Sequence, residues 1–310
     1  MIGDNEGVSS SAAEFRAGFA CFVGRPNVGK STLMNALVGA KVAITSSKPQ
    51  TTRRAIRGIV TRPDAQLVIV DTPGLHRPRT LLGERLDSLV LSTLTEVDVI
   101  GFCVPANEPI GKGDRFIAEK LAAVKKTPVV AVVTKCDLAS REQIAGQLLA
   151  VSRLADFAEI VPVSAESGEQ LGTLGDLLVD RLPESPPLYA GGELTDEPEH
   201  VLVAELIREA ALEGVRDELP HSIAVLVEEM VPRQGRDDLL DVYAQMYVER
   251  PSQKAIVIGP KGARLKEVGT RARKHIEALL GTHVYLDLRI KVAKDWQRDP
   301  KQLRRLGFYD

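Results

Sequence analysis

The sequence predicts an α/β fold with a doubly wound, mostly parallel sheet, followed by a smaller α+β domain. Apolar runs of about five to seven residues alternate with longer segments of helical period, as strands and helices do in such folds. These runs are continuously apolar, which indicates strands buried on both faces by helices. The length of 310 residues, with 44% hydrophobic residues, is enough for two cores.

The apolar and polar patterns place the elements in order along the chain. The strands expected in the first domain are Phe19–Val23, Leu67–Val70, Val97–Val104, Val129–Val133 and Ile160–Val163. Residues 182–198 contain four prolines and two adjacent glycines, which predicts a linker. Beyond it we expect a helix over Val201–Leu212, strands over Ile223–Val231 and Asp241–Glu249, a helix over Lys261–Leu280 broken near Gly269, and a strand over His283–Val292. The predicted organisation is a disordered tail over 1–16, a first domain over 17–182, a linker over 183–198 and a second domain over 199–310.

Composition narrows the class of protein. No apolar run approaches the roughly 20 residues of a membrane span, and the polar N-terminus lacks the pattern of a secretory signal, so we expect a cytoplasmic protein. Cys21, Cys103 and Cys136 lack metal-ligand spacing, which indicates buried reduced thiols.

The net charge is −2, yet residues 254–310 carry 14 Lys and Arg against 6 Asp and Glu, a local charge of +8. Charge alone fits either a nucleic-acid face or a solvated helix surface.

A phosphate-binding loop is predicted directly after the first strand. The motif is Gly24-Arg25-Pro26-Asn27-Val28-Gly29-Lys30-Ser31, and Thr32 to Val38 has helical period. Glycines let backbone N–H groups wrap the phosphates, while Lys30 reaches the β and γ oxygens and the Ser31 hydroxyl binds Mg²⁺. The expected nucleotide contacts therefore extend from Gly24 through Thr32.

A second phosphate-sensing motif, Asp71-Thr72-Pro73-Gly74, follows the strand Leu67–Val70. Its position puts a carboxylate near the metal and the Gly74 N–H near the γ-phosphate. Between the two motifs, Gln50-Thr51-Thr52-Arg53 lies in a polar segment with no core face, where a threonine closes over Mg²⁺; Thr52 is favoured over Thr51. The expected catalytic residues are Lys30, Thr52, Asp71 and Gly74, and the expected metal ligands are Ser31, Thr52 and Asp71.

The nucleotide base is predicted to be guanine. Thr134-Lys135-Cys136-Asp137 follows a strand, and the Asp137 carboxylate can accept from both guanine N1–H and N2–H₂, whereas adenine offers neither donor there. The methylene stem of Lys135 would cover the base plane. After Ile160–Val163, a backbone N–H of Ser164 or Ala165 is placed to meet guanine O6.

The sequence contains no visible side-chain base for hydrolysis. Leu75 follows Gly74, where Ras-like enzymes soon place a water-orienting glutamine. One hypothesis is that Asn27 holds K⁺ against the phosphates in place of an arginine finger. His76 is not assigned a role, because a loop histidine is more often a solvated surface residue.

A Gly-x-x-Gly loop marks the basic C-terminal region. Gly259-Pro260-Lys261-Gly262 lies after the apolar Val257-Ile258, interpreted as a strand end, and before a basic helix. Such glycines let a nucleic-acid backbone approach closely, as in KH domains. In the absence of an aromatic platform, the expected RNA contacts are this loop with Lys254, Arg264 and Lys266, and single-stranded RNA is favoured over duplex.

With these motifs in order, the chain resembles the bacterial Era GTPases from about Phe19 to its end. The resemblance rests on GRPNVGKST, QTTR, DTPGLH, TKCD, SAESG and GPKGARLKEVG. It implies a P-loop GTPase domain joined to a type II KH domain, with binding to the 3′ end of small-subunit ribosomal RNA, a role in assembly of the small ribosomal subunit, and peripheral association with the inner membrane. Thr134 stands where the family has Asn, and Pro260 where it usually has a basic residue.

A further hypothesis links the nucleotide site to the KH domain. In it, γ-phosphate contacts to Thr52 and Gly74 order the segments around Thr45–Arg54 and Leu75–Leu86, which contact the KH domain and change RNA access. Two alternatives remain, an RNA-binding scaffold with negligible turnover and another RNA-directed GTPase. A tRNA-modifying GTPase would need a further helical domain and a catalytic cysteine near a terminus.

Overall fold

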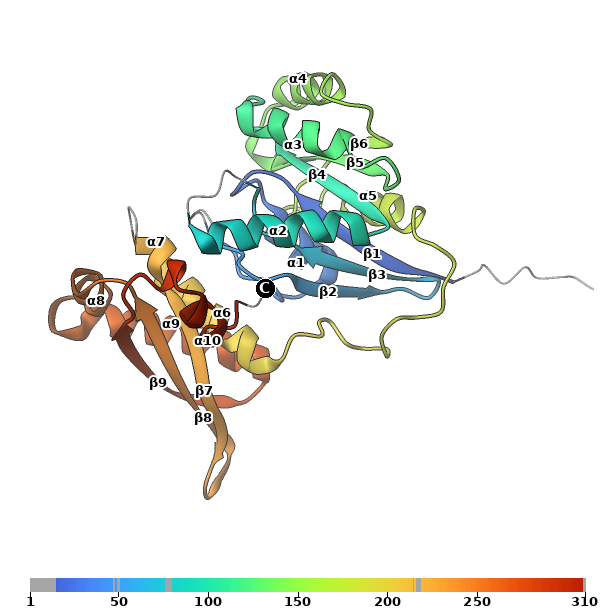
Figure 1. Cartoon of the computed structure of the whole chain (residues 1–310). Coiled ribbons are helices and arrows are strands. Elements are labelled where there is room, and N and C mark those ends of the chain that lie inside the picture. The colour runs from blue at the N-terminus through green and yellow to red at the C-terminus, as the bar shows by residue number, and fades with distance from the viewer. Residues whose placement is uncertain are drawn as a thin grey trace, which may run out of the picture.

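The computed structural model describes residues 15–46, 48, 51–75, 80–213, 215 and 219–308. Gln50, His76, Tyr309 and the expected tail residues 1–14 lie outside the described residues. The described chain forms a larger α/β part and a smaller α+β part that lie against each other (Figure 1).

The larger part is built on a six-stranded sheet with strand order β2-β3-β1-β4-β5-β6. All neighbouring pairs are parallel except β2 and β3, which are antiparallel. The strands are β1 Arg16–Val23, β2 Ile56–Thr61, β3 Ala65–Asp71, β4 Val99–Pro105, β5 Val129–Thr134 and β6 Glu159–Pro162. The helices are α1 Lys30–Val38, α2 Leu81–Glu96, α3 Lys112–Ala122, α4 Arg141–Ser152 and α5 Leu171–Val179, with a 3-10 turn η1 at Cys136–Leu138.

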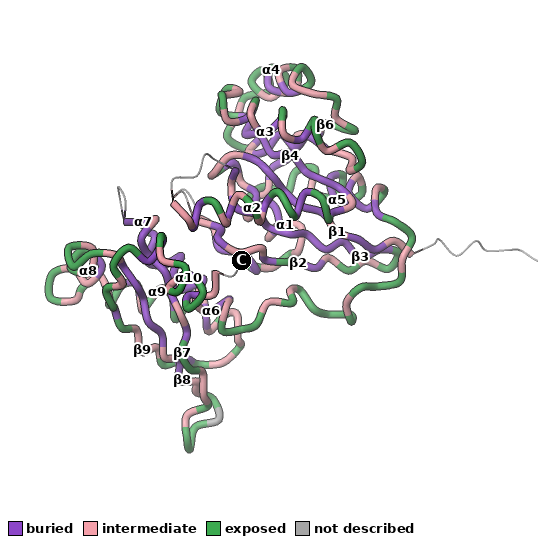
Figure 2. Tube along the Cα trace, in the orientation of Figure 1, coloured by how far each residue is buried: buried purple, intermediate pink, exposed green. Residues whose placement is uncertain are grey.

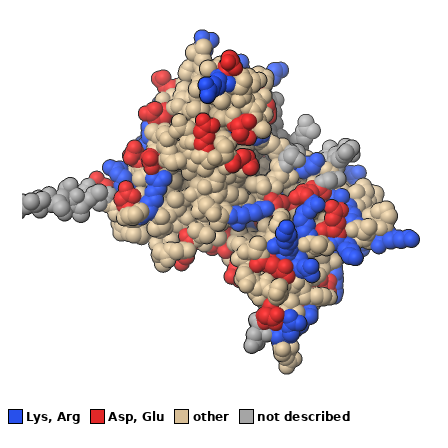
Figure 3. Space-filling model, turned by 180° about the vertical axis from the view of Figure 1, so that it is seen from behind, with Lys and Arg blue, Asp and Glu red and all other residues tan. Residues whose placement is uncertain are grey.

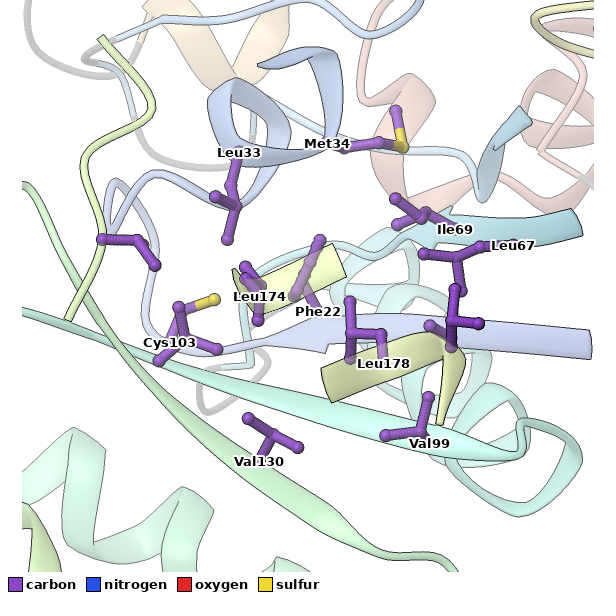
Figure 4. Packing of buried hydrophobic residues seen from close by; sticks show 14 of the residues in the cluster. Phe22, Leu33, Met34, Leu67, Ile69, Val99, Cys103, Val130, Leu174 and Leu178 are labelled. Atoms are coloured by element: carbon purple, nitrogen blue, oxygen red, sulfur yellow. The ribbon is translucent and has the colours of Figure 1, made fainter. Parts of the chain in front are cut away.

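Helices cover both faces of this sheet. Leu33 and Met34 of α1 and Leu174 and Leu178 of α5 pack on one face around Phe22 (Figure 4). Side chains of α2, α3 and α4 pack on the other face. Because both faces are covered, the inner strands β3, β1, β4 and β5 are buried along most of their length (Figure 2), as their continuous apolar runs predicted.

The proline-rich segment between the two parts, residues 183–198, is held by hydrogen bonds along the β2 edge of the larger sheet. The Ile59 N–H of β2 donates to Leu194 O at 2.9 Å, and the Gln66 side chain of β3 bonds the backbone of Leu188 and Tyr189. A salt bridge of 2.8 Å joins Arg57 to Asp196. The segment therefore follows the larger part of the chain before it enters the smaller one.

The smaller part is a three-stranded sheet, β7-β8-β9, with antiparallel and parallel pairs and helices on one face. Its elements are α6 Glu199–Leu212, α7 Leu219–Ser222, β7 Ala224–Arg233, β8 Arg236–Val248, α8 Pro251–Ile258, η2 Pro260–Gly262, α9 Ala263–Leu280, β9 His283–Val292, η3 Trp296–Arg298 and α10 Pro300–Arg305.

Three sequence-based expectations about local structure are wrong. Val257 and Ile258 end helix α8 instead of a strand, because Pro251 and Gln253 supply the start of a helix. Helix α9 continues through Gly269 without a break, held by packing of the buried residues on either side of that glycine. Arg53 is only 2% exposed, although its segment was expected to have no core face.

An interface between the two parts buries a cluster drawn from distant segments. Leu82 and Leu86 of α2 pack with Trp296, Leu303 and Leu306 near the C-terminus. The indole N–H of Trp296 donates to Ser222 O at 3.0 Å. The segment after β9 thus lies between α2 and the small sheet, where Figure 1 places α10.

Candidate nucleotide and nucleic-acid sites

The phosphate loop joins β1 to α1 and lines a cleft of about 520 Å³. Gly24 is required because a Cβ there would lie 2.6 Å from Cys103 O, and Gly29 has a φ of 98° at the helix start. Lys30 is buried, with its Nζ 3.3 Å from Gly24 O and 3.0 Å from Arg25 O. Burial lowers the pKa of Lys30. An ammonium group therefore lies inside the loop that the sequence assigned to phosphates.

The three residues predicted as metal ligands meet at one point. The Ser31 hydroxyl lies 2.7 Å from Asp71 Oδ2, the Thr52 hydroxyl lies 3.0 Å from the same oxygen, and the two hydroxyls are 3.1 Å apart. Among the described residues, Asp71 Oδ1 is buried with no hydrogen-bond partner. Burial raises the pKa of Asp71, against the hydrogen bond from Ser31. An all-oxygen set with an unpartnered buried carboxylate oxygen fits Mg²⁺.

The end of β3 brings the second phosphate motif against the first. A Cβ on Gly74 would lie 2.8 Å from Pro26 N, so only glycine permits this approach. The Thr72 hydroxyl donates to Phe22 O at 2.8 Å and fixes the strand end. Leu75 is buried in the core below, so its side chain does not reach the cleft.

A second pocket, of about 130 Å³, lies beside the cleft and holds the predicted base-reading residues. Asp137 Oδ1 accepts from the Ser164 hydroxyl at 2.6 Å. Lys135 crosses to the phosphate loop, with its Nζ 2.7 Å from Asn27 O. The backbone N–H of Ser164 donates to Glu169 O at 3.1 Å, whereas Ala165, the other residue whose amide was expected to meet guanine O6, lines the pocket.

Thr134 connects the base-reading strand to the phosphate loop. Its hydroxyl donates to Val28 O at 2.6 Å, and the residue is buried. A threonine therefore supplies the connection expected from an asparagine at this position.

The Arg25 side chain points away from the cleft. It contacts Asp114 at 2.8 Å and Glu108 at 3.2 Å, and Asp114 is fully buried at the start of α3. Only the backbone of Arg25 is thus placed to meet a nucleotide.

Several pocket-lining residues were missed by the sequence analysis. Ile44, Thr45 and Ser46 line the cleft, and Leu138 and Glu166 line the base pocket. Their proximity in sequence to Thr52, Asp137 and Ala165 was the available signal, and only Glu166 belongs to a motif, SAESG.

The Gly-x-x-Gly loop lies between two helices, α8 and α9. Gly259, Lys261 and Gly262 all have positive φ, of 71°, 50° and 77°. Lys261 and Lys266 are exposed, whereas Lys254 and Arg264 are half-buried. In the face shown by Figure 3, Lys and Arg side chains gather over the smaller part of the molecule, with acidic residues among them.

Comparison with known proteins agrees with this geometry. Residues 19–135 match a family described as 50S ribosome-binding GTPase, and residues 218–297 match the KH domain. The GTPase Era of Streptomyces coelicolor is 68% identical over 301 residues, covering 94% of this chain and 95% of that protein. The GTPase Era of a Nocardioides species is 65% identical, covering 98% and 99%. The chain belongs to the Era GTPase family.

Two solved Era structures superpose on this family member over 96% of its length and 100% of theirs, each at 37% identity. One, with a TM-score of 0.90, is Era in complex with MgGDPNP and nucleotides 1506–1542 of 16S ribosomal RNA. The other, with a TM-score of 0.91, is a single-residue variant of Aquifex aeolicus Era bound to GDP·AlF4⁻. The chain is therefore a GTP-hydrolysing enzyme in which a P-loop domain precedes a KH domain. Across the described ranges, no helix has the length and hydropathy of a membrane span.

Proposed function

We propose that this Era-family GTPase binds GTP and Mg²⁺ in the cleft, binds single-stranded RNA from the 3′ end of small-subunit ribosomal RNA, and acts in assembly of the small ribosomal subunit. The convergence of Ser31, Thr52 and Asp71 is the observation that carries the nucleotide half. The RNA half is supported by the exposed Gly-x-x-Gly loop and by the related Era that was solved with MgGDPNP and a 16S ribosomal RNA segment. The proposed GTPase domain, linker and KH domain are 17–182, 183–198 and 199–310.

Each residue of the cleft has a proposed role. The backbone of the loop from Gly24 to Thr32 binds the phosphates, with Lys30 as a cation inside it. Ser31, Thr52 and Asp71 hold Mg²⁺, which when bound neutralises charge on the β and γ oxygens. The Gly74 N–H meets the γ-phosphate, and Asp137 selects guanine through its carboxylate.

The attacking water has no side-chain base in this proposal. Leu75 is buried away from the cleft, so catalysis rests on positioning and charge stabilisation. Asn27, exposed at the rim of the cleft, is proposed to hold K⁺ against the phosphates. We expect faster turnover in KCl than in NaCl and loss of that difference in Asn27→Ala. Equal rates in both salts would remove K⁺ from the mechanism.

The RNA proposal is tested by filter binding to a short single strand that copies the 3′ end of small-subunit ribosomal RNA. Binding is measured with a GTP analogue, with GDP and without nucleotide. Gly262→Asp should abolish binding, because it places a carboxylate in the loop where a Cβ meets nothing within 4 Å. Gly281→Asp is the matched control, since Gly281 is equally open, also has a positive φ, of 67°, and lies at the other end of α9, away from the loop. Binding that is absent in every state would refute the RNA half and leave a GTPase with another basic-surface partner.

We also infer a cytoplasmic location with peripheral contact at the inner face of the membrane. Fractionation of cells with and without a high-salt wash tests it, because a peripheral protein is released by salt.

A further inference from the structure

Helix α6 touches both the nucleotide cleft and the KH loop. It starts the KH domain, packs on α9 through buried Ala210 and Ala211, and lies next to the segment that precedes Thr52. Its buried polar residues, Glu205, Arg208 and Glu209, face the GTPase domain instead of solvent.

The first contact joins α6 to the segment between α1 and Thr52. Glu209 Oε1 accepts from the Thr45 N–H at 2.8 Å, and Lys41 Nζ lies 2.5 Å from Glu209 Oε2. Ile44, between these two residues, is 3% exposed within the core of the KH domain. The beginning of this segment is therefore attached to α6 by an ion pair, a backbone hydrogen bond and an apolar side chain.

The second contact joins α6 to the residue beside the metal cluster. The Arg208 guanidinium, 2% exposed, donates to Thr51 O. Glu205 holds the same guanidinium at 2.5 Å. Because Thr51 directly precedes Thr52, a backbone movement of Thr52 that carries the Thr51 carbonyl with it displaces Arg208 or breaks this hydrogen bond.

The third contact lies at the C-terminal end of α6, about one turn beyond Arg208 and Glu209. Arg264 follows the Gly-x-x-Gly loop by two residues, and its Nη2 donates to Glu213 O at 2.6 Å and to Ala211 O at 3.4 Å. These carbonyls belong to the last turn of α6, where backbone acceptors lack intrahelical partners and a cation is favoured. A Cβ on Gly259 would lie 2.7 Å from Arg264 Cβ, so the Arg264 side chain also packs directly against the loop.

We propose, building on the RNA-binding function above, that Arg264 is a positioning residue that fixes the Gly-x-x-Gly loop to the C-terminus of α6, and that α6 conveys the state of the Thr45–Thr52 segment to that loop. The Arg264 guanidinium donates hydrogen bonds to carbonyls of α6. Among the described residues, the exposed side chains of Lys261 and Lys266 have no such partner. RNA phosphates are then contacted by Lys261 inside the loop and Lys266 after it, and the RNA affinity of the loop changes when Thr52 moves.

Salt dependence distinguishes a positioning residue from a phosphate contact. Each phosphate contact on a single strand contributes about 0.7 to the slope of log affinity against log salt. We expect Arg264→Gln to weaken RNA binding at one salt concentration but to keep the wild-type slope. Lys261→Gln, the matched control in the same loop, should lower the slope by about 0.7.

A second measurement needs no RNA. In wild-type protein we expect amide hydrogen exchange of residues 255–266 to differ between the GTP-analogue and GDP states, because α6 connects that loop to Thr52. Arg264→Gln should abolish the difference, and so should Glu209→Gln, which removes the ion pair between α6 and Lys41. Lys261→Gln should keep it. Arg264→Lys, which keeps the charge but lacks the planar fork that reaches two carbonyls, should restore only part of it.

The outcomes separate this inference from the proposed function. If wild-type protein binds no RNA, the RNA function fails while the exchange measurement still decides the role of Arg264. If RNA binds and Arg264→Gln lowers the salt slope by about 0.7 with the exchange difference intact, Arg264 is an RNA contact and the inference is overturned. It is equally overturned if exchange of residues 255–266 in wild-type protein is the same with both nucleotides.

Discussion

Arg53 lies in a polar segment of the sequence, but its side chain is buried and joins the two domains through hydrogen bonds. Its guanidinium, 2% exposed, donates to Ile223 O at 2.6 Å, His221 O at 2.8 Å and Pro220 O at 3.0 Å. It also lies 5.7 Å from the centroid of the Trp296 ring. Burial lowers the pKa of Arg53 to about 9, yet the side chain stays charged at neutral pH.

Replacing Arg53 with alanine leaves three buried carbonyls without their donor. Each buried carbonyl left without a donor costs about 1 to 3 kcal/mol, so the loss at the three carbonyls is at least about 3 kcal/mol. For a urea dependence of about 3 kcal/mol per molar, this loss moves the transition that opens the interface down by about 1 M or more. The GTPase sheet and the KH sheet do not include Arg53, so each should remain folded at that point.

The single tryptophan of the chain reports this event directly. Trp296 is fully buried at the interface and stacks on Phe308. We expect Trp296 fluorescence in Arg53→Ala to change at lower urea than the circular dichroism of the helices. The control is Arg57→Ala, which removes a more exposed pair with Asp196 worth about 1 kcal/mol or less. A Trp296 transition within about 0.3 M of wild type would show that Arg53 contributes little to docking.

Three further outcomes follow from other contacts. Asp137→Asn, which changes the partner of the Ser164 hydroxyl, should weaken GTP at least about 100-fold and admit a xanthine nucleotide, measured by competition for a fluorescent nucleotide. Gly74→Ala should lower turnover far more than it lowers the melting temperature, since its Cβ would meet phosphate-loop backbone at 2.8 Å. Burial alone would raise the pKa of Glu205, but the Arg208 guanidinium outweighs it and lowers the pKa, so the pairing stabilises the fold above pH 4.5 and is lost below. The free energy of unfolding in urea near pH 7 should therefore be about 2 kcal/mol higher for wild type than for Glu205→Gln. This difference should shrink as the pH falls below 4.5.

The nucleotide site was largely predictable because its parts are local. Each motif joins the end of an apolar strand to a loop, and carboxyl ends of parallel strands meet at one edge of a sheet. Ser31, Asp71 and Asp137 could therefore be placed from strand order alone. Thr52 could be placed only by its position between two motifs, and the structure puts its hydroxyl 3.0 Å from Asp71 Oδ2.

The contacts between the domains could not be predicted for the opposite reason. Arg53 meets residues 167 to 170 positions away, and nothing in the polar segment around it signals burial. Helix α8 was missed since Val257 and Ile258 are β-favouring residues whose helical state is set by Pro251 and Gln253 upstream. The sequence does not distinguish Arg264 from the other cations of α9, because only the structure shows that its guanidinium contacts α6.

The position of the last helix has a consequence for how the protein is made and handled. Leu303 and Leu306 complete the interface, and Phe308 O accepts from Arg85 of α2 at 2.7 Å. A ribosome synthesises these residues well after the strands of the larger sheet, so that sheet can form on the nascent chain before the segment that fixes its orientation to the smaller sheet has been made. A nascent chain can then hold a formed nucleotide cleft while the two domains are not yet joined. A tag or fluorescent label attached close after Phe308 would extend directly from this interface and disturb it.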